Sequence, residues 1–137
     1  MTGVRIAERI VGEGYPTFVI AEAGVNHNEN VELGKALIKA AKEAGADAIK
    51  FQTYKAERLS TRTALRYWLE PDDPNGTQFD TFARLDGLDE AGHRELQAYA
   101  QEVGILWFST PFDEEAVDFL DSLGVPAFKV ASADMTC

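Results

Sequence analysis

Short apolar segments alternate with helix-forming segments along almost the whole chain, and this order constrains the fold more than any other feature. The predicted strands cover residues 17–24, 46–54, 105–112 and 127–132. Each is nearly continuously apolar, which is typical of buried strands in a parallel sheet. Segments with helical periodicity separate them. The order β-α-β-α-β-α-β predicts a parallel sheet with helices outside, joined by right-handed crossovers.

The three intervening segments each carry an apolar stripe and end signals of a helix. Asp89 and Asp113 are predicted N-caps of the second and third helices, and Gly45, Gly104 and Gly124 are predicted stops. The predicted buried stripes are Leu33, Leu37, Ile38, Ala41 and Ala44; Leu96, Tyr99, Ala100 and Val103; and Ala116, Val117, Leu120 and Leu123.

Two segments depart from this alternation. Residues 5–16 alternate apolar and polar side chains up to a Gly-Glu-Gly turn, which predicts a hairpin before the first core strand. Residues 55–87 are too long for a plain connection between strand and helix and contain the turn signals "PDDPNG". This stretch is either a lid or substrate loop, or an insertion without a role in binding. We expect Tyr67, Trp68, Phe79 and Phe82 to form a small core of its own.

Doubly wound and barrel folds both begin with this element order. A dinucleotide-binding fold needs three glycines after its first strand, whereas "EAGVNHNEN" has one. The sequence therefore favours a barrel.

Composition limits the classes of partner. The 137 residues are enough for one domain, and the formal charge of −10 opposes binding to nucleic acid or anionic membranes. No apolar run approaches the ~20 residues of a membrane span, and the N-terminus lacks the core of a signal peptide. Cys137 is the single cysteine, so no internal disulfide or cysteine-based zinc site is expected. We expect a cytoplasmic protein with a small partner molecule.

Polar side chains follow each predicted strand where it ends, and ligands bind at this edge of parallel α/β folds. The candidate site residues are Glu22, Asn26 and His27 after the first strand, Lys50 and Gln52 on the second, Thr110 and Phe112 on the third, and Lys129, Ser132 and Asp134 on the fourth. His93 lies beside the apolar stripe of its helix, which indicates a structural role.

Two lysines make this edge unusual. Lys50 and Gln52 share one face of a strand, and Lys129 lies on the equivalent face of another. A desolvated ammonium needs a negative partner, which is either an internal carboxylate such as Glu22 or a bound anion. A Lys–Glu ion pair that only joins two strands would explain one such lysine. Two lysines beside hydroxyl and amide donors favour an anion site, and we expect both to project into one hollow.

The chain resembles the sialic acid synthase family, which includes N-acetylneuraminate and legionaminate synthases and spore-coat polysaccharide synthesis proteins. The matching motifs are "IAEAGVNHN", "AGADAIKFQTYKAERL", "FSTPFDEEAVDFL" and "GVPAFKVASADMT". The fold that this resemblance implies is a (β/α)8 TIM barrel. Residues 1–137 would form its N-terminal half, with a hairpin, four parallel strands and three helices. The C-terminal half and the antifreeze-like domain of many members have no counterpart here.

The resemblance also implies an activity, which is condensation of phosphoenolpyruvate with an N-acylated hexosamine such as N-acetylmannosamine to give a nine-carbon 2-keto acid. By motif position, Lys50, Thr110, Lys129 and Ser132 would hold phosphoenolpyruvate, and Glu22 would act near the reacting centre. Gln52, Phe112 and Asp134 would contact the amino sugar, with Asn26 and His27 beside Glu22. "VNHN" and "KFQTY" resemble the neuraminate and legionaminate branch more than the pseudaminate branch.

Members of that family need a divalent metal, Mn or Mg, whose histidine ligands belong to later strands, so we expect no metal ligands in this chain. A half barrel would expose one sheet face and two open strand edges, so we expect a homodimer or a complementing half-barrel chain. The chain is expected to be either a fragment of a longer protein or a natural half barrel, and alone it is expected to be incomplete and inactive. The alternative is a non-catalytic half-barrel module that binds a phosphorylated metabolite or a partner chain.

Overall fold

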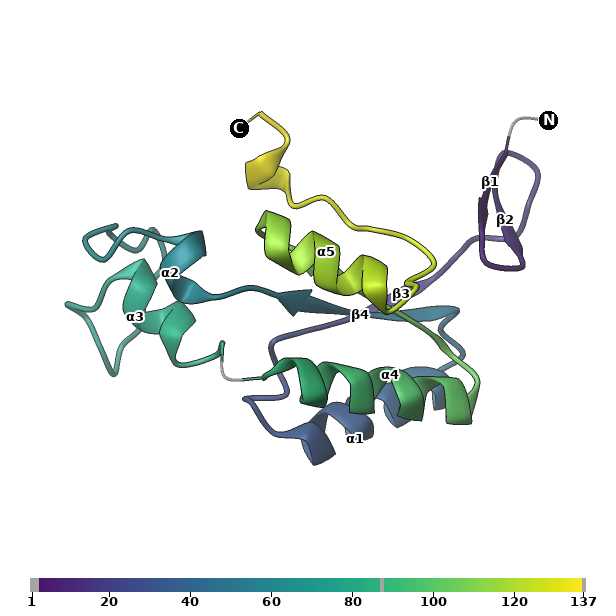
Figure 1. Ribbon diagram of the computed structural model, residues 1–137, viewed down its shortest axis with the longest axis horizontal. Coiled ribbons are helices and arrows are strands. Elements are labelled where there is room, and N and C mark those ends of the chain that lie inside the picture. The colour runs from purple at the N-terminus through teal and green to yellow at the C-terminus, as the bar shows by residue number, and fades with distance from the viewer. Residues whose placement is uncertain (1–2, 87, 137) are drawn as a thin grey trace.

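The computed structural model describes residues 3–86 and 88–136 (Figure 1). Gly87, the predicted end of the long connection, and Cys137 lie outside the described residues. The chain forms a parallel sheet in the order β3-β4-β5, preceded by a hairpin. The strands are β3 (Ile20–Gly24), β4 (Ala48–Thr53) and β5 (Leu106–Pro111). Three of the four predicted core strands are therefore confirmed, each a little shorter than expected.

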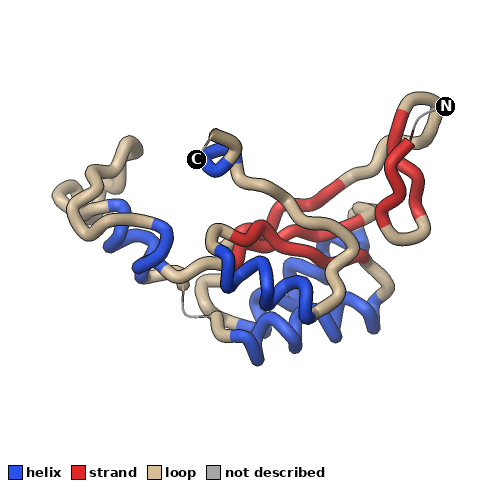
Figure 2. Tube along the Cα trace, turned by 45° about the horizontal axis from the view of Figure 1, so that its top comes forward, coloured by secondary structure: helices blue, strands red, loops and turns tan. Residues whose placement is uncertain are grey.

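The main helices pack on one face of this sheet (Figure 2). They are α1 (Val31–Glu43), α4 (Glu90–Val103) and α5 (Glu114–Ser122). The core between the layers contains Ile49 and Phe51 from β4, Trp107 from β5, Ile38 from α1 and Leu96 from α4. Because side chains alternate along a strand, Glu22, Lys50, Gln52, Phe108 and Thr110 belong to the opposite face, called here the helix-free face.

The predicted caps are confirmed. Asp89 accepts a hydrogen bond from the Gly92 amide at the start of α4, and Asp113 accepts one from the Ala116 amide at the start of α5. Gly104 ends α4 with φ of 76°, a left-handed conformation that glycine adopts without strain.

Two of the predicted apolar stripes include side chains that the structure leaves exposed. Leu33 and Val117 are 39% and 41% exposed, and Ala44, the C-cap of α1, is exposed too, so the assignment of these three residues to buried stripes is wrong. At Gly34 on α1, an added Cβ would lie 2.7 Å from Leu96 Cδ2, and this close approach of α1 to α4 leaves Leu33 at the rim of the contact.

The predicted hairpin is confirmed as β1 (Gly3–Ile6) paired antiparallel with β2 (Arg9–Gly12). Its turn comes at Ala7, with φ of 49°, and not at the Gly-Glu-Gly sequence further along. Arg9 pairs with Asp47, which also accepts a hydrogen bond from the Val19 amide at 2.7 Å. Asp47 therefore links the hairpin to the beginning of the sheet.

The long connection projects from one end of the sheet and carries α2 (Ala56–Leu59) and α3 (Gln78–Ala83) (Figure 1). Trp68 and Phe82 pack with ring centroids 6.0 Å apart, as expected of a small separate core. Tyr67 is 88% exposed, so its assignment to that core is wrong. Phe79 is covered by the guanidinium of Arg62, 4.4 Å from the ring centroid.

The fourth predicted strand, residues 127–132, is not formed in the structure. Among the described residues, this segment joins no strand ladder, and Ser132–Asp134 form a short 3-10 helix, η1. If the strand order β3-β4-β5 continued, a strand here would pair with β5, which is one edge of the sheet, and Phe128 and Val130 are 42% and 54% exposed. The apolar pattern predicts extended backbone, but pairing also needs neighbours that cover both faces.

Candidate active site

The helix-free face brings together four of the predicted site residues, and Lys50 lies at their centre. Lys50 forms an ion pair with Glu22, which is opposite it in the register of β3 and β4. Its ammonium also lies 3.2 Å from Thr110 Oγ1 on β5. Gln52 is opposite Thr110 in the register of β4 and β5. Three neighbouring strands thus contribute to the cluster: β3 with Glu22, β4 with Lys50 and Gln52, and β5 with Thr110.

A bulge in β3 shapes this cluster. The register shifts between Glu22 and Gly24, where Gly24 has φ of 53°. A Cβ on Gly24 would lie 3.3 Å from Glu22 Oε1 and 3.7 Å from Gln52 Nε2. Glycine therefore suits the positive φ at this bulge, and a side chain here would crowd the Glu22 carboxylate.

Burial gives the cluster its chemical character. The side chain of Lys50 is 11% exposed, whereas that of Glu22 is 52% exposed. A positive charge held in a largely buried position beside a hydroxyl binds anions strongly, because little water competes for it. Glu22 now neutralises this charge from a half-exposed position.

The remaining residues of the fourth predicted strand lie elsewhere. Lys129 is exposed and donates a hydrogen bond to the Val130 carbonyl. With Phe112 and Asp134, it lines a groove of about 350 Å³ at the start of α5, and Lys50 is not among the described residues around that groove. The expectation that Lys50 and Lys129 share one hollow is therefore wrong for this structure. The cause is the missing strand, since Lys129 would reach the helix-free face only if its segment paired with β5.

Three further predicted residues are not joined to the cluster. Ser132 and Asp134 are exposed in η1. Asn26 is exposed, and its backbone amide donates to the Ala23 carbonyl in the turn after β3.

His27 is buried on the helix side of the sheet, with its ring centroid 5.9 Å from that of Phe51. Its Nδ1 accepts a hydrogen bond from the Glu29 amide at 3.1 Å. Burial is the main cause that lowers the pKa of His27 below 6.5, and nearby His93 lowers it further. The neutral ring therefore fixes the loop after β3 and does not line the cluster around Lys50.

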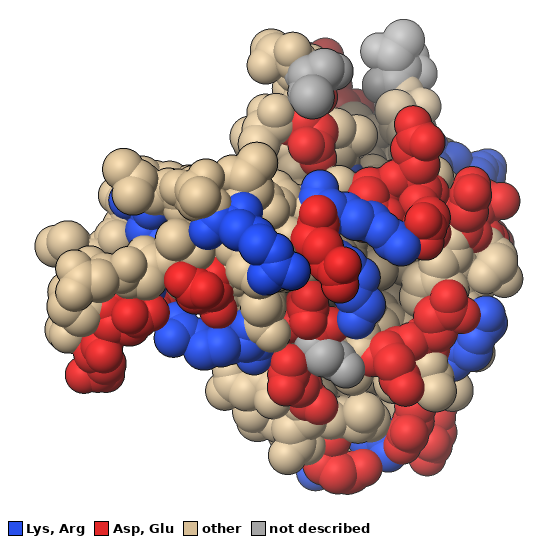
Figure 3. Space-filling model, turned by 60° about the vertical axis from the view of Figure 1, so that its left-hand side comes forward, with Lys and Arg blue, Asp and Glu red and all other residues tan. Residues whose placement is uncertain are grey.

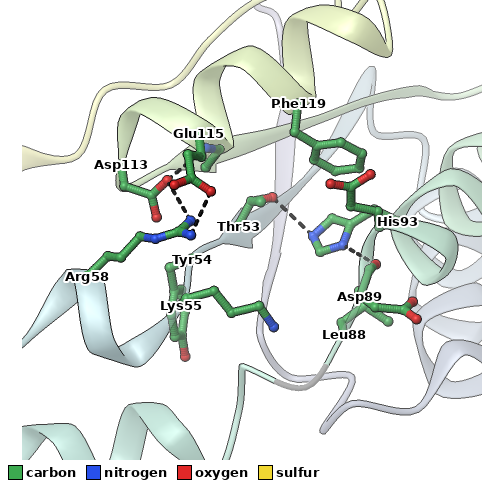
Figure 4. Close-up of a pocket in the computed structure, with 12 residues that line it drawn as sticks. Thr53, Tyr54, Lys55, Arg58, Leu88, Asp89, His93, Asp113, Glu115 and Phe119 are labelled. Atoms are coloured by element: carbon green, nitrogen blue, oxygen red, sulfur yellow. Dashed lines mark hydrogen bonds and ion pairs between the residues drawn. The ribbon is translucent and has the colours of Figure 1, made fainter.

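A second group of polar residues was not predicted as a site and lies on the helix side (Figure 4). His93 Nε2 lies 3.0 Å from Thr53 Oγ1, which in turn lies 2.8 Å from Ser109 Oγ. His93 Nδ1 lies 2.8 Å from the Asp89 carbonyl. The expected structural role of His93 agrees with these bonds, which tie α4 to β4 and β5.

This group borders a cavity of about 100 Å³, where Arg58 pairs with Asp113 and Glu115 (Figure 4). Lys55 Nζ donates to the Asp86 carbonyl at 2.6 Å. The cationic groups here are thus engaged by groups of the chain itself. The sequence analysis did not identify Arg58 as a member of this group. Arg58 lies in α2, at the start of the long connection.

Figure 3 shows one face, where basic side chains lie among acidic ones and form no continuous basic surface. No helix in the described parts of the chain is both long and apolar enough to cross a membrane.

The residues present do not fit a divalent metal site. Within residues 3–86 and 88–136, no group of three or more His, Cys, Asp or Glu side chains is placed to hold an ion. Both ring nitrogens of His93 are used within the protein, and His27 Nδ1 is used by a backbone amide. His93 therefore has no free ring nitrogen for a metal, and His27 has one at most, on Nε2.

Known proteins share both the sequence and the fold. The model of the NeuB family matches residues 37–137. N,N'-diacetyllegionaminic acid synthase of Legionella pneumophila is 44% identical over 127 residues, which are 91% of this chain and 35% of that protein. The chain thus spans about a third of the length of such relatives.

Two crystal structures are similar to the structure of this chain. The N-acetylneuraminic acid (sialic acid) synthetase of Leptospira borgpetersenii, in complex with citrate, is 29% identical with a TM-score of 0.80, over 98% of this chain and 43% of that one. The spore coat polysaccharide biosynthesis protein SpsE of Bacillus subtilis is 36% identical with a TM-score of 0.72, over 96% and 34%. Because the family model covers most of the chain and the motifs around Glu22, Lys50 and Thr110 fall on one sheet face, this protein belongs to the NeuB family.

Proposed function

We propose that this chain forms part of the phosphoenolpyruvate site of a synthase that makes a nine-carbon 2-keto sugar acid. The observation that carries the proposal is the largely buried Lys50 ammonium, held between Glu22 and Thr110 on the helix-free face. Phosphoenolpyruvate has a carboxylate and a phosphate, and a desolvated ammonium with a hydroxyl donor is suited to either group.

The condensation needs groups that these residues supply. The enol carbon of phosphoenolpyruvate forms a bond to the aldehyde carbon of an N-acylated hexosamine, water adds to C2, and phosphate leaves. Lys50 and Thr110 would hold the anionic group in place, and Glu22 would accept the proton of the attacking water. Gln52, which lies beside Gly24 and close to Glu22, would bind the amino sugar through its side-chain amide.

Lys129 and Ser132 have a place in this proposal only after a rearrangement. β5 is the end of the sheet, and a parallel strand at residues 127–131 would carry Lys129 on the same face as Lys50. We propose that association with a complementing chain or a second copy stabilises this strand. Analytical ultracentrifugation checks association, and a chain that remains monomeric at all concentrations counts against it.

Calorimetric titration with phosphoenolpyruvate tests the anion site. Lys50→Ala should lower the affinity at least about tenfold, because it removes the buried charge. Lys39→Ala is the matched control, since Lys39 is exposed on α1 and pairs with Glu43. Absence of binding by a folded wild-type chain, or equal effects of both substitutions, would refute the site.

The alternative is a non-catalytic module that binds a phosphorylated metabolite. It is favoured by the position of the Lys50 ammonium between Glu22 and Thr110, which suits an anion without requiring a second substrate. Release of phosphate from phosphoenolpyruvate and N-acetylmannosamine separates the two functions. Binding without turnover supports the module, and turnover that is lost in Lys50→Ala supports the synthase.

A further inference from the structure

Besides Trp107 Nε1, two buried polar atoms on the helix side of the sheet have no hydrogen-bond partner among the described residues. They are His27 Nε2, in the loop after β3, and the Tyr54 hydroxyl, directly after β4. The residues are 1% and 7% exposed, so bulk solvent does not reach them. Buried polar groups in folded proteins almost always have a partner, either in the protein or in an ordered water.

Both residues line the same small cavity. Its volume is about 10 Å³, and its wall also includes Asp86, Leu88 and His93. A space of this size, about one probe sphere, holds one water molecule and excludes larger ligands. The wall is polar enough for such a water, because it contains the two unpartnered groups.

The hydrogen-bond partners fix which atom of His27 carries a proton. The Glu29 amide can only donate, so His27 Nδ1, 3.1 Å away, accepts and carries no hydrogen. Burial lowers the pKa of His27, so the ring is neutral near pH 7. A neutral ring with a bare Nδ1 has its proton on Nε2, which is therefore a donor in need of an acceptor.

We propose that one internal water binds in this cavity, accepts a hydrogen bond from His27 Nε2, and makes a second hydrogen bond with the Tyr54 hydroxyl. A water can accept and donate at once, so it satisfies both groups. It connects the loop that follows Glu22 to the end of the strand that carries Lys50 and Gln52. His27 and Tyr54 are thus positioning residues, and the water site does not depend on the proposed function.

A high-resolution crystal structure and imidazole ¹⁵N NMR test this proposal. We expect electron density for one water within about 2.6–3.2 Å of both atoms. The NMR spectrum should show the Nε2–H tautomer for His27. His93 is an internal control with the opposite tautomer, because its Nδ1 faces the Asp89 carbonyl, which can only accept.

Tyr54→Phe should cause loss of the water density while the His27 tautomer is retained, since the Glu29 amide sets it. Tyr67→Phe is the matched control, because Tyr67 is 88% exposed and should leave the density unchanged. A direct hydrogen bond between His27 Nε2 and Tyr54 without water density, or a proton on His27 Nδ1, would overturn the proposal. If Tyr54→Phe does not fold, the wild-type density and tautomer still decide.

Discussion

Glu22 and Lys50 occupy opposite positions on β3 and β4 and form an ion pair on the helix-free face. The pair has two consequences. It compensates the charge of a largely buried lysine, and it places a carboxylate where an incoming anion would bind. An anion that binds Lys50 would therefore have to compete with the Glu22 carboxylate.

The first prediction concerns the competition between the Glu22 carboxylate and a bound anion for the Lys50 ammonium. Glu22→Gln should strengthen binding of inorganic phosphate by about two- to tenfold, because a negative charge next to the Lys50 ammonium is removed. Titration calorimetry measures the change, and Glu43→Gln on the exposed face of α1 is the control. Weaker phosphate binding by Glu22→Gln would mean that the carboxylate helps to hold the anion.

The second prediction concerns the bulge. Gly24→Ala should lower the free energy of unfolding by about 1–2 kcal/mol, since alanine at positive φ is strained. It should also weaken phosphate binding, because the added methyl group would fill space next to Glu22 Oε1 and Gln52 Nε2, 3.3 and 3.7 Å away, where the anion would lie.

Gly45→Ala separates these two effects. Gly45 has φ of 81° and no heavy atom within 4 Å of an added Cβ, so the substitution brings backbone strain alone. Urea denaturation should report a similar loss of stability for both variants, and only Gly24→Ala should bind phosphate more weakly. Equal phosphate affinity in the two variants would contradict the role of Gly24 in the cluster.

The sequence predicts the local parts of this fold well. Asp89 and Asp113 cap their helices as expected, because a cap depends only on residues within one turn. The cluster of Glu22, Lys50, Gln52 and Thr110 could also be predicted. Period-two alternation gives the face, and the parallel order brings the strand ends together.

The errors come from long-range packing. Residues 127–132 have a strand pattern, but pairing depends on a neighbour beyond β5, so Lys129 could not be placed from its own sequence. The hydrogen bond between Thr53 and His93 joins residues 40 positions apart, and neither residue carries a local sign of the other. Gly34 illustrates the same limit, since its contact with Leu96 decides how α1 meets α4.

The third prediction concerns pH near neutrality. Burial, the largest cause, lowers the pKa of His93 below 6.5, so the unfolded chain binds a proton more readily than the folded chain. The contribution of neutral His93 is fully present above pH 6.5 and is lost as pH falls through the folded pKa. Denaturation between pH 5.5 and 7.5 should therefore show decreasing stability toward acid, and an unchanged stability across this range would contradict the buried neutral ring.

The fourth prediction concerns the long connection, whose polar centre is Glu70. This carboxylate accepts hydrogen bonds from Thr81 at 2.8 Å and Trp68 Nε1 at 3.2 Å, and it pairs with Arg66 and Arg84. The hydrogen bond from Thr81 is the largest cause that lowers the pKa of Glu70 from 4.5 to about 2. Its stabilising effect is present above pH 4.5 and is lost as pH falls through about 2.

The Trp68 indole N–H resonance reports this titration directly. It should shift as pH falls from 4.5 toward 2, and Glu70→Gln should remove that shift because glutamine does not ionise. Glu57→Gln, at an exposed position of α2 in the same connection, should leave the shift intact. The Trp68 resonance should respond to the carboxylate that accepts the indole hydrogen bond. If the resonance titrates equally in Glu70→Gln, a carboxylate other than Glu70 causes the shift, and the prediction is contradicted.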